Sequence, residues 1–156
     1  MNFDELTELH PEPVPTPKRE LRLFEEAEKA TAYHKAIEAV PEATAHFFGG
    51  SSGLNLPAAD MDVFMLVPDL NETAARLEEY GFTYPHFNDY DNKGFIPLRK
   101  GDLNIIAMDD EHDFEQTAIA YKVCQYLVSE GIIPTKEQRK VIHRILRGEP
   151  TSFVIP

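Results

Sequence analysis

The chain has 156 residues, of which 42% are hydrophobic and 27% charged, a mixture typical of one globular domain. Its 15 Lys and Arg residues stand against 27 Asp and Glu residues, which gives a formal net charge of -12. This composition excludes collagen-like, low-complexity and disulfide-scaffold proteins, and the negative charge makes nonspecific nucleic-acid binding unexpected. A local basic pocket or a metal-bridged nucleotide stays compatible with it.

The single cysteine, Cys124, cannot form an intrachain disulfide, so we expect a reducing, cytoplasmic setting. We expect this side chain to fill the core rather than to react. No apolar run approaches the length that spans a bilayer, and the acidic first ten residues lack a signal-peptide core. The sequence therefore predicts a protein without membrane association.

Residues 1–19 contain alternating prolines, at Pro11, Pro13, Pro15 and Pro17. Proline cannot continue a helix or pair in a strand, so an extended, polyproline-like arm is predicted. It is either a loose leader or an arm that docks on a protein partner or on the domain itself. The arm's candidate anchors are Phe3, Leu6 and Leu9.

Residues 20–150 are predicted to form a single domain and 151–156 a C-terminal tail.

Helical spacing of apolar residues predicts a helix over 20–40, which a proline follows. Its expected buried stripe is Leu21, Leu23, Phe24, Ala27, Ala30, Tyr33, Ile37 and Val40. A strand over 45–48, a glycine-rich turn over 49–53 and a strong strand over 60–67 come next, and Pro68 ends this strand.

A second helix is predicted over 70–80, capped by Asp69 or Asn71 and ended at Gly81. A short strand over 82–84 follows it. The helix is expected to bury Leu70, Ala74, Leu77 and Tyr80.

A hairpin is predicted from strands over 95–99 and 102–108, which a Lys-Gly turn joins. Two helices close the chain, one over 112–130 and one that starts at Thr135 with Gln138 in capping-box position. We interpret the acids at 109–113 as the entry to the first of them. This order predicts an α+β fold in which a small mixed or antiparallel sheet carries helices on one face.

Two acids, Asp60 and Asp62, stand two residues apart on the strand predicted for 60–67. Alternation along a strand places both carboxylates on one face, roughly 7 Å apart at the backbone. Their mutual repulsion is relieved by a divalent cation, and hard Mg²⁺ prefers carboxylate oxygens together with substrate phosphates. A plain solvated strand face is the alternative interpretation.

The turn before this strand supplies groups that suit a phosphate. Gly49 and Gly50 allow backbone N–H groups to approach a phosphate closely, and Ser51 and Ser52 add hydroxyl donors. A glycine turn followed by paired acids is what metal-assisted phosphoryl transfer requires.

The run Phe48-Gly49-Gly50, followed after nine residues by Asp60-Met61-Asp62-Val63, resembles the signature of the nucleotidyltransferase superfamily, the group that includes DNA polymerase beta. The resemblance implies that superfamily's mixed-sheet core and a bound nucleoside triphosphate (NTP). It further implies that Asp60 and Asp62 hold Mg²⁺ or Mn²⁺, while Gly49, Gly50, Ser51 and Ser52 bind the nucleotide.

The second half resembles small nucleotidyltransferase-like proteins encoded by bacteriophages, which would place the protein in the host cytoplasm. The resemblance rests on the order of short motifs: Asp102-Leu103-Asn104-Ile105-Ile106, Asp109-Asp110, Phe114, Ala120-Tyr121-Lys122-Val123-Cys124, Lys136-Glu137-Gln138-Arg139 and Ile145-Leu146-Arg147-Gly148.

The superfamily places a third catalytic acid on a neighbouring strand. The matching position here is Asn104, and Asp102 is expected two residues earlier on the same face. Asn104 can offer a cation its carbonyl oxygen but supplies neither charge nor a base, so Asp102 is the other candidate. If neither completes the site, nucleotide binding would remain while catalysis would be lost.

Two functions follow as hypotheses. The first is a metal-dependent transfer of a nucleotidyl group from an NTP to an unknown acceptor. The second is a weak or inactive member that acts by binding and inhibiting a host or rival protein. Lys93, Arg99 and Lys100 are candidates for phosphate contacts, with ordinary surface positions as the alternative.

Overall fold

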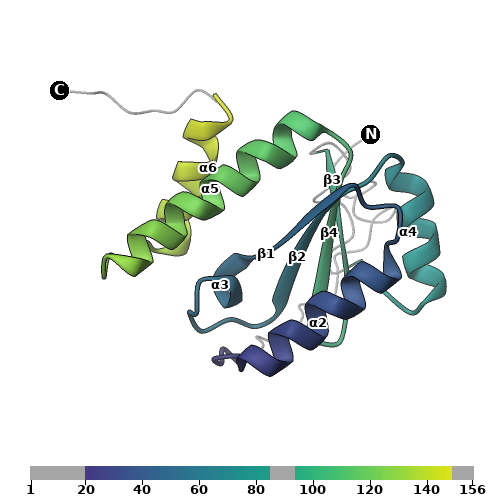
Figure 1. Cartoon of the computed structure of the whole chain (residues 1–156), viewed down its shortest axis with the longest axis horizontal. Coiled ribbons are helices and arrows are strands. Elements are labelled where there is room, and N and C mark those ends of the chain that lie inside the picture. The colour runs from purple at the N-terminus through teal and green to yellow at the C-terminus, as the bar shows by residue number, and fades with distance from the viewer. Residues whose placement is uncertain (1–19, 85–93, 149–156) are drawn as a thin grey trace, which may run out of the picture.

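The computed structural model describes residues 20–84 and 94–148, so the predicted arm and C-terminal tail lie outside the described residues (Figure 1). The elements in chain order are α2 (Glu26–Ala39), β1 (Ala45–Gly49), α3 (Gly50–Gly53), β2 (Met61–Leu66), α4 (Leu70–Glu79), β3 (Phe95–Lys100), β4 (Leu103–Met108), α5 (Glu111–Ser129) and α6 (Lys136–Leu146).

The four strands form one mixed sheet in the order β1-β2-β4-β3. β2 and β4 are parallel, whereas the outer strands β1 and β3 run antiparallel to their neighbours. The chain leaves β2 through α4 and the hairpin partner β3 before it enters β4, and parallel neighbours need such a long crossover. The predicted α+β class with a small mixed sheet is therefore confirmed.

Helices cover both faces of the sheet, so the expectation of helices on one face is wrong. α2 and α4 pack on the face that carries Met61, Val63 and Met65, all buried. On the opposite face Phe47 and Phe64 stack at 4.7 Å between ring centroids, and aromatic rings of α5 pack over Phe47. Figure 1 shows α5 and α6 across the sheet from α2 and α4. Apolar rings on the acid-bearing face make a second cover necessary, because exposing them to water is unfavourable.

α2 begins at Glu26, six residues later than predicted. Arg22 forms a β-bridge with Ala58, with N–H···O distances of 3.0 and 2.9 Å, which keeps the chain before the helix extended. Leu21 and Leu23 are consequently exposed rather than part of a buried stripe. The buried positions within the helix are Lys29, Ala32 and Ala36, whereas Ala27 and Ala30 are exposed.

The other helix boundaries follow the predicted caps. Asp69 caps α4 by accepting from the backbone N–H of Glu72, and the capping box of Thr135 and Gln138 starts α6. α5 begins after Asp110, whose carboxylate accepts from a backbone N–H of the first turn, so the acids there serve as a helix entry. Tyr80 was predicted to belong to the buried face of α4, but its side chain is 53% exposed, so this prediction is wrong.

Within the described ranges no helix is both long and apolar enough to cross a membrane. Cys124 is 1% exposed, as expected of a residue that fills the core.

Candidate functional site

A polar row crosses the whole sheet at one end. The strand register places Gly49 of β1 beside Asp62 of β2, Asp62 beside Asn104 of β4, and Asn104 beside Arg99 of β3. Asp62 alternates with the buried Met61 and Val63, so the row lies on the α5 side of the sheet, away from α2 and α4. Three strands thereby bring one acid, one amide and one guanidinium together.

The two predicted acids are neighbours, and each has a partner on the adjacent strands. Asn104 Nδ2 donates to Asp62 Oδ1 at 3.0 Å, and Arg99 Nη2 donates to Asp60 Oδ2 at 2.7 Å. Asp60 precedes the first residue of β2 instead of lying within the strand as predicted. The Arg99–Asp60 ion pair is largely shielded from water, with side chains 21% and 18% exposed.

The surroundings of Asp62 favour the protonated, uncharged form of its carboxyl group. Burial and, after it, the negative charge of Asp60 raise its pKa from 3.8 to about 7, whereas the hydrogen bond from Asn104 opposes the shift. Near pH 7 this face therefore changes its charge readily. A divalent cation would compete with the proton of Asp62 for the same oxygens.

The predicted glycine turn is a single helical turn, α3, and its first residue rests on the Asp62 carboxylate. Gly50 has φ +68°, and a Cβ built on it would lie 2.3 Å from Asp62 Oδ2. A side chain is excluded at this position both by the backbone conformation and by the space available. Gly50 thus brings bare backbone directly against the acid.

The two serines of α3 have different surroundings. Ser51 Oγ accepts a hydrogen bond from Arg139 Nη2 of α6 at 2.7 Å. Ser52 is 1% exposed, and its hydroxyl is buried with no hydrogen-bond partner. The structure thus places Ser51 at the surface of the site, whereas Ser52 points into the interior, where a phosphate cannot reach it.

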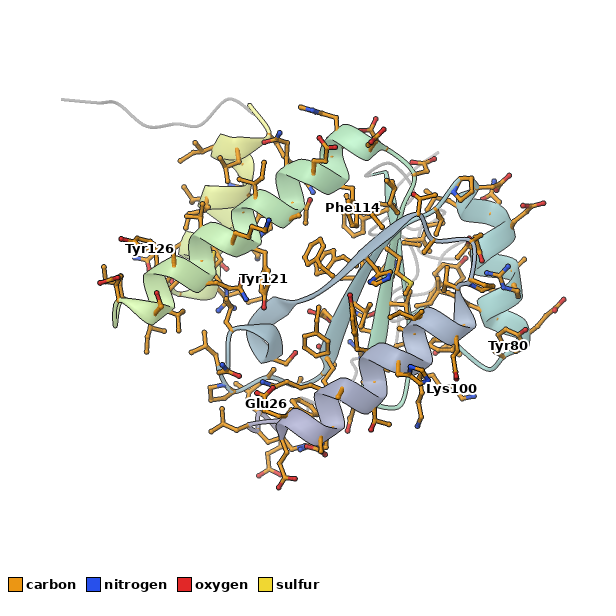
Figure 2. All side chains as sticks on the ribbon, in the orientation of Figure 1. Glu26, Tyr80, Lys100, Phe114, Tyr121 and Tyr126 are labelled. Carbon is orange, nitrogen blue, oxygen red and sulfur yellow. The ribbon has the colours of Figure 1, made fainter. Side chains whose placement is uncertain are left out.

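Arg139 is a site residue that the sequence analysis missed. A cavity of about 80 Å³ beside Gly50 is lined by Arg139, by Tyr121 of α5 and by His143 of α6. Figure 2 shows Phe114 and Tyr121 extending from α5 toward the sheet. A charge count could have indicated α6, because residues 136–147 contain five of the chain's 15 Lys and Arg residues and a single acid.

The inner row of α6 carries three basic groups that no carboxylate of the described residues neutralises. Arg147 Nη2 donates to Thr117 Oγ1 at 3.3 Å, and Arg139 donates to Ser51. Between these two arginines the pKa of His143 is lowered, mainly by burial and then by their positive charges. Unneutralised positive charge in a protein of net charge -12 favours an anionic ligand at this place.

Asp102, the other candidate for the third acid, lies elsewhere. It belongs to the turn before β4, and its carboxylate is 3.4 Å from Arg22 Nη2. It lines a groove of about 930 Å³ on the α2 side of the sheet, which contains neither Asp60 nor Asp62. The predicted alternation fails here because β4 begins only at Leu103. The strand neighbour of Asp62 is therefore Asn104.

The donors on this face suit a hard divalent cation in type, although they carry only two negative charges. The described residues contain no group of three or more His, Cys, Asp and Glu side chains that could hold a metal. Asp60, Asp62 and Asn104 nevertheless present oxygen atoms, and Asn104 Oδ1 is buried without a hydrogen-bond partner. An unsatisfied buried acceptor beside two carboxylates fits a cation with oxygen ligands.

No protein-family model and no curated protein sequence matches the chain. Among solved structures, it is similar to the conserved protein GrpB from Enterococcus faecalis, with a TM-score of 0.52, 13% identity, and coverage of 82% of this chain and 95% of GrpB.

Two weaker matches are a cytoplasmic RNA terminal U-transferase and Cid1 in complex with its short product ApU. Each is 17% identical over 67% of this chain, with a TM-score of 0.37, and the match covers 36% and 35% of these proteins. Similarity at this level carries no argument about activity.

The element order, the mixed sheet and the GrpB similarity together identify the architecture. At 13% identity the similarity shows the fold alone. The resemblance to bacteriophage proteins is not tested by these structures and stays a prediction. The chain has an α+β fold with a mixed four-stranded sheet, similar to the fold of GrpB.

Proposed function

We propose that the protein binds an NTP together with Mg²⁺ or Mn²⁺ on the Asp60–Asp62 face and transfers the nucleotidyl group to an acceptor. The observation that carries this proposal is the convergence of the two acids with the bare backbone of Gly50. Arg139, joined to Ser51 beside them, adds positive charge for the phosphates.

Nucleotidyl transfer joins an acceptor hydroxyl oxygen to the α-phosphorus and breaks the bond from that phosphorus to the leaving pyrophosphate. A bound divalent cation would neutralise phosphate charge during this exchange. Arg139 is placed to hold phosphate oxygens, since guanidinium groups bind them through two parallel N–H donors. Asn104 cannot accept the hydroxyl proton, so this proton would pass to water or to a carboxylate of the acid pair.

Calorimetry with ATP, GTP, CTP and UTP tests the binding step. We expect one of the four to bind in Mg²⁺ or Mn²⁺ and to lose most of its affinity in EDTA. Release of pyrophosphate with candidate acceptors then tests transfer. If no nucleotide binds with or without the cation, the proposal is wrong.

The arginine of α6 gives a sharper test of where the phosphates lie. Arg139→Ala should weaken NTP binding at least about tenfold, because a charge-assisted hydrogen bond to phosphate contributes about 1.5–3 kcal/mol. Arg144→Ala is the matched control, since this arginine is exposed on the same helix and should change affinity less than about twofold. Equal losses in both variants would indicate a general charge effect and contradict the placement.

A second candidate function, binding a partner protein without turnover, is favoured by Asn104 in the place of a third acid. Asn104→Asp separates the two functions. The added carboxylate should tighten Mn²⁺ binding about tenfold, because affinity for hard cations follows ligand charge. If nucleotide binds to the natural protein but pyrophosphate is released only by Asn104→Asp, the natural chain acts by binding. Release by both proteins supports transfer as its function.

A further inference from the structure

Arg99 supplies positive charge where the two carboxylates need it. Its Nη2 donates to Asp60 Oδ2 at 2.7 Å, and its charge also acts on the pKa of Asp62 in the lowering direction. Two carboxylates and one guanidinium leave a net charge of -1 when both acids are ionised. Arg99 is therefore the internal counter-ion of the acid pair.

The backbone of Arg99 is fixed on both sides, and its side chain is held by the ion pair with Asp60. It pairs with Asn104 of β4 on one side, and on the other it exchanges N–H···O bonds of 2.8 Å with Thr83. The side chain is 21% exposed and its Nε is buried without an acceptor. Rotation of the side chain alone would release Asp60 without disturbing the sheet.

We propose that Arg99 competes with a divalent cation for Asp60 and Asp62, so that the guanidinium leaves Asp60 when the cation binds. This inference rests on the proposed cation site. Arg99 already occupies Asp60 Oδ2, which the cation would also use, and the mutual repulsion of the two positive groups at short range disfavours simultaneous binding. Arg99 thus sets the cation affinity of the site and keeps it low when no ligand neutralises the displaced guanidinium.

Mn²⁺ titration of the full-length protein, without nucleotide, tests the competition. Arg99→Met keeps an aliphatic stem but removes the charge, and should bind Mn²⁺ at least about tenfold more tightly than the natural protein. The matched control is Arg76→Met, because Arg76 forms a comparable partly buried ion pair with Glu42. It should leave Mn²⁺ affinity unchanged. Arg99→Met combined with Asp62→Asn should lose the gain, which places the ion at the acid pair.

A measurement on the unaltered protein keeps the test independent of how Arg99→Met folds. Phenylglyoxal modifies exposed guanidinium groups, and mass spectrometry locates the modified arginines. Adding Mn²⁺ should raise the modification rate of Arg99 severalfold while that of Arg76 stays constant. An unchanged rate at Arg99, under Mn²⁺ concentrations that saturate the site, would overturn the proposal.

The outcomes separate this inference from the proposed function. Equal Mn²⁺ affinity in the natural protein and Arg99→Met, lost in Asp62→Asn, would refute the competition and leave the cation site standing. Absence of Mn²⁺ binding in Arg99→Met, when that variant is folded by circular dichroism, would refute both. Tighter binding in Arg99→Met alone supports both.

Discussion

Asp62→Asn should stabilise the cation-free protein above pH 7 by about 4 kcal/mol, because a partly buried carboxylate is removed from a place that disfavours its charge. The pKa of Asp62 in the folded protein is about 7, above its ordinary value of 3.8. Between these values the folded state holds a proton that the unfolded state has released. The free energy of unfolding of the natural protein therefore falls as the pH rises from about 4 to 7.

Urea denaturation in EDTA at several pH values measures this effect. The two proteins should be equally stable near pH 4 and should diverge as the pH rises, with Asp62→Asn the more stable. Glu79→Gln, which changes an exposed acid on α4, should follow the natural protein at every pH. The same Asp62 variant should lose cation-dependent nucleotide binding by 100-fold or more, since about 3 kcal/mol of charged contact disappears. Parallel pH curves for all three proteins would contradict the burial of the Asp62 charge.

Gly50→Ala is the second substitution with a large expected effect. An alanine there must adopt φ +68° and must place its Cβ 2.3 Å from Asp62 Oδ2. The first requirement costs about 1 kcal/mol, and displacing a partly buried carboxylate adds to it, so we expect a loss of about 3 kcal/mol. Thermal or urea unfolding at pH 8 measures the loss.

Gly101→Ala is the control, because Gly101 has a similar φ of +61° with no atom within 4 Å of an added Cβ. It should lose only the backbone part, about 1 kcal/mol. On an Asp62→Ala background, Gly50→Ala should also fall to this smaller loss, since the obstructing oxygen is gone. If both glycine substitutions cost the same in the natural background, Gly50 does not lie against the acid.

The order of elements was predictable because each rests on local chemistry. Alternation of apolar residues specified β2, and caps specified helix ends, as at Asp69, Thr135 and Gln138. These signals lie within a few residues of one another, so no long-range contact was needed to interpret them.

Other features depended on contacts between residues far apart in the sequence. The bridge of Arg22 with Ala58 makes α2 begin later than predicted. The aromatic pair Phe47–Phe64 lies on the second face of the sheet, where α5 packs against it. The alternation of side chains along a strand could not show whether Asp102 belongs to β4, because this alternation stops in the turn before Leu103.

The composition of the site was decided by the parallel pairing of β2 with β4. That register puts Asn104 beside Asp62, while the antiparallel β3 adds Arg99, and α6 returns Arg139 to Ser51 across 88 residues. By itself the sequence determined that Asp60 and Asp62 lie close together at the start of β2. Only the tertiary structure decided which groups neutralise them, because charge balance depends on distances between strands and helices that local patterns do not encode.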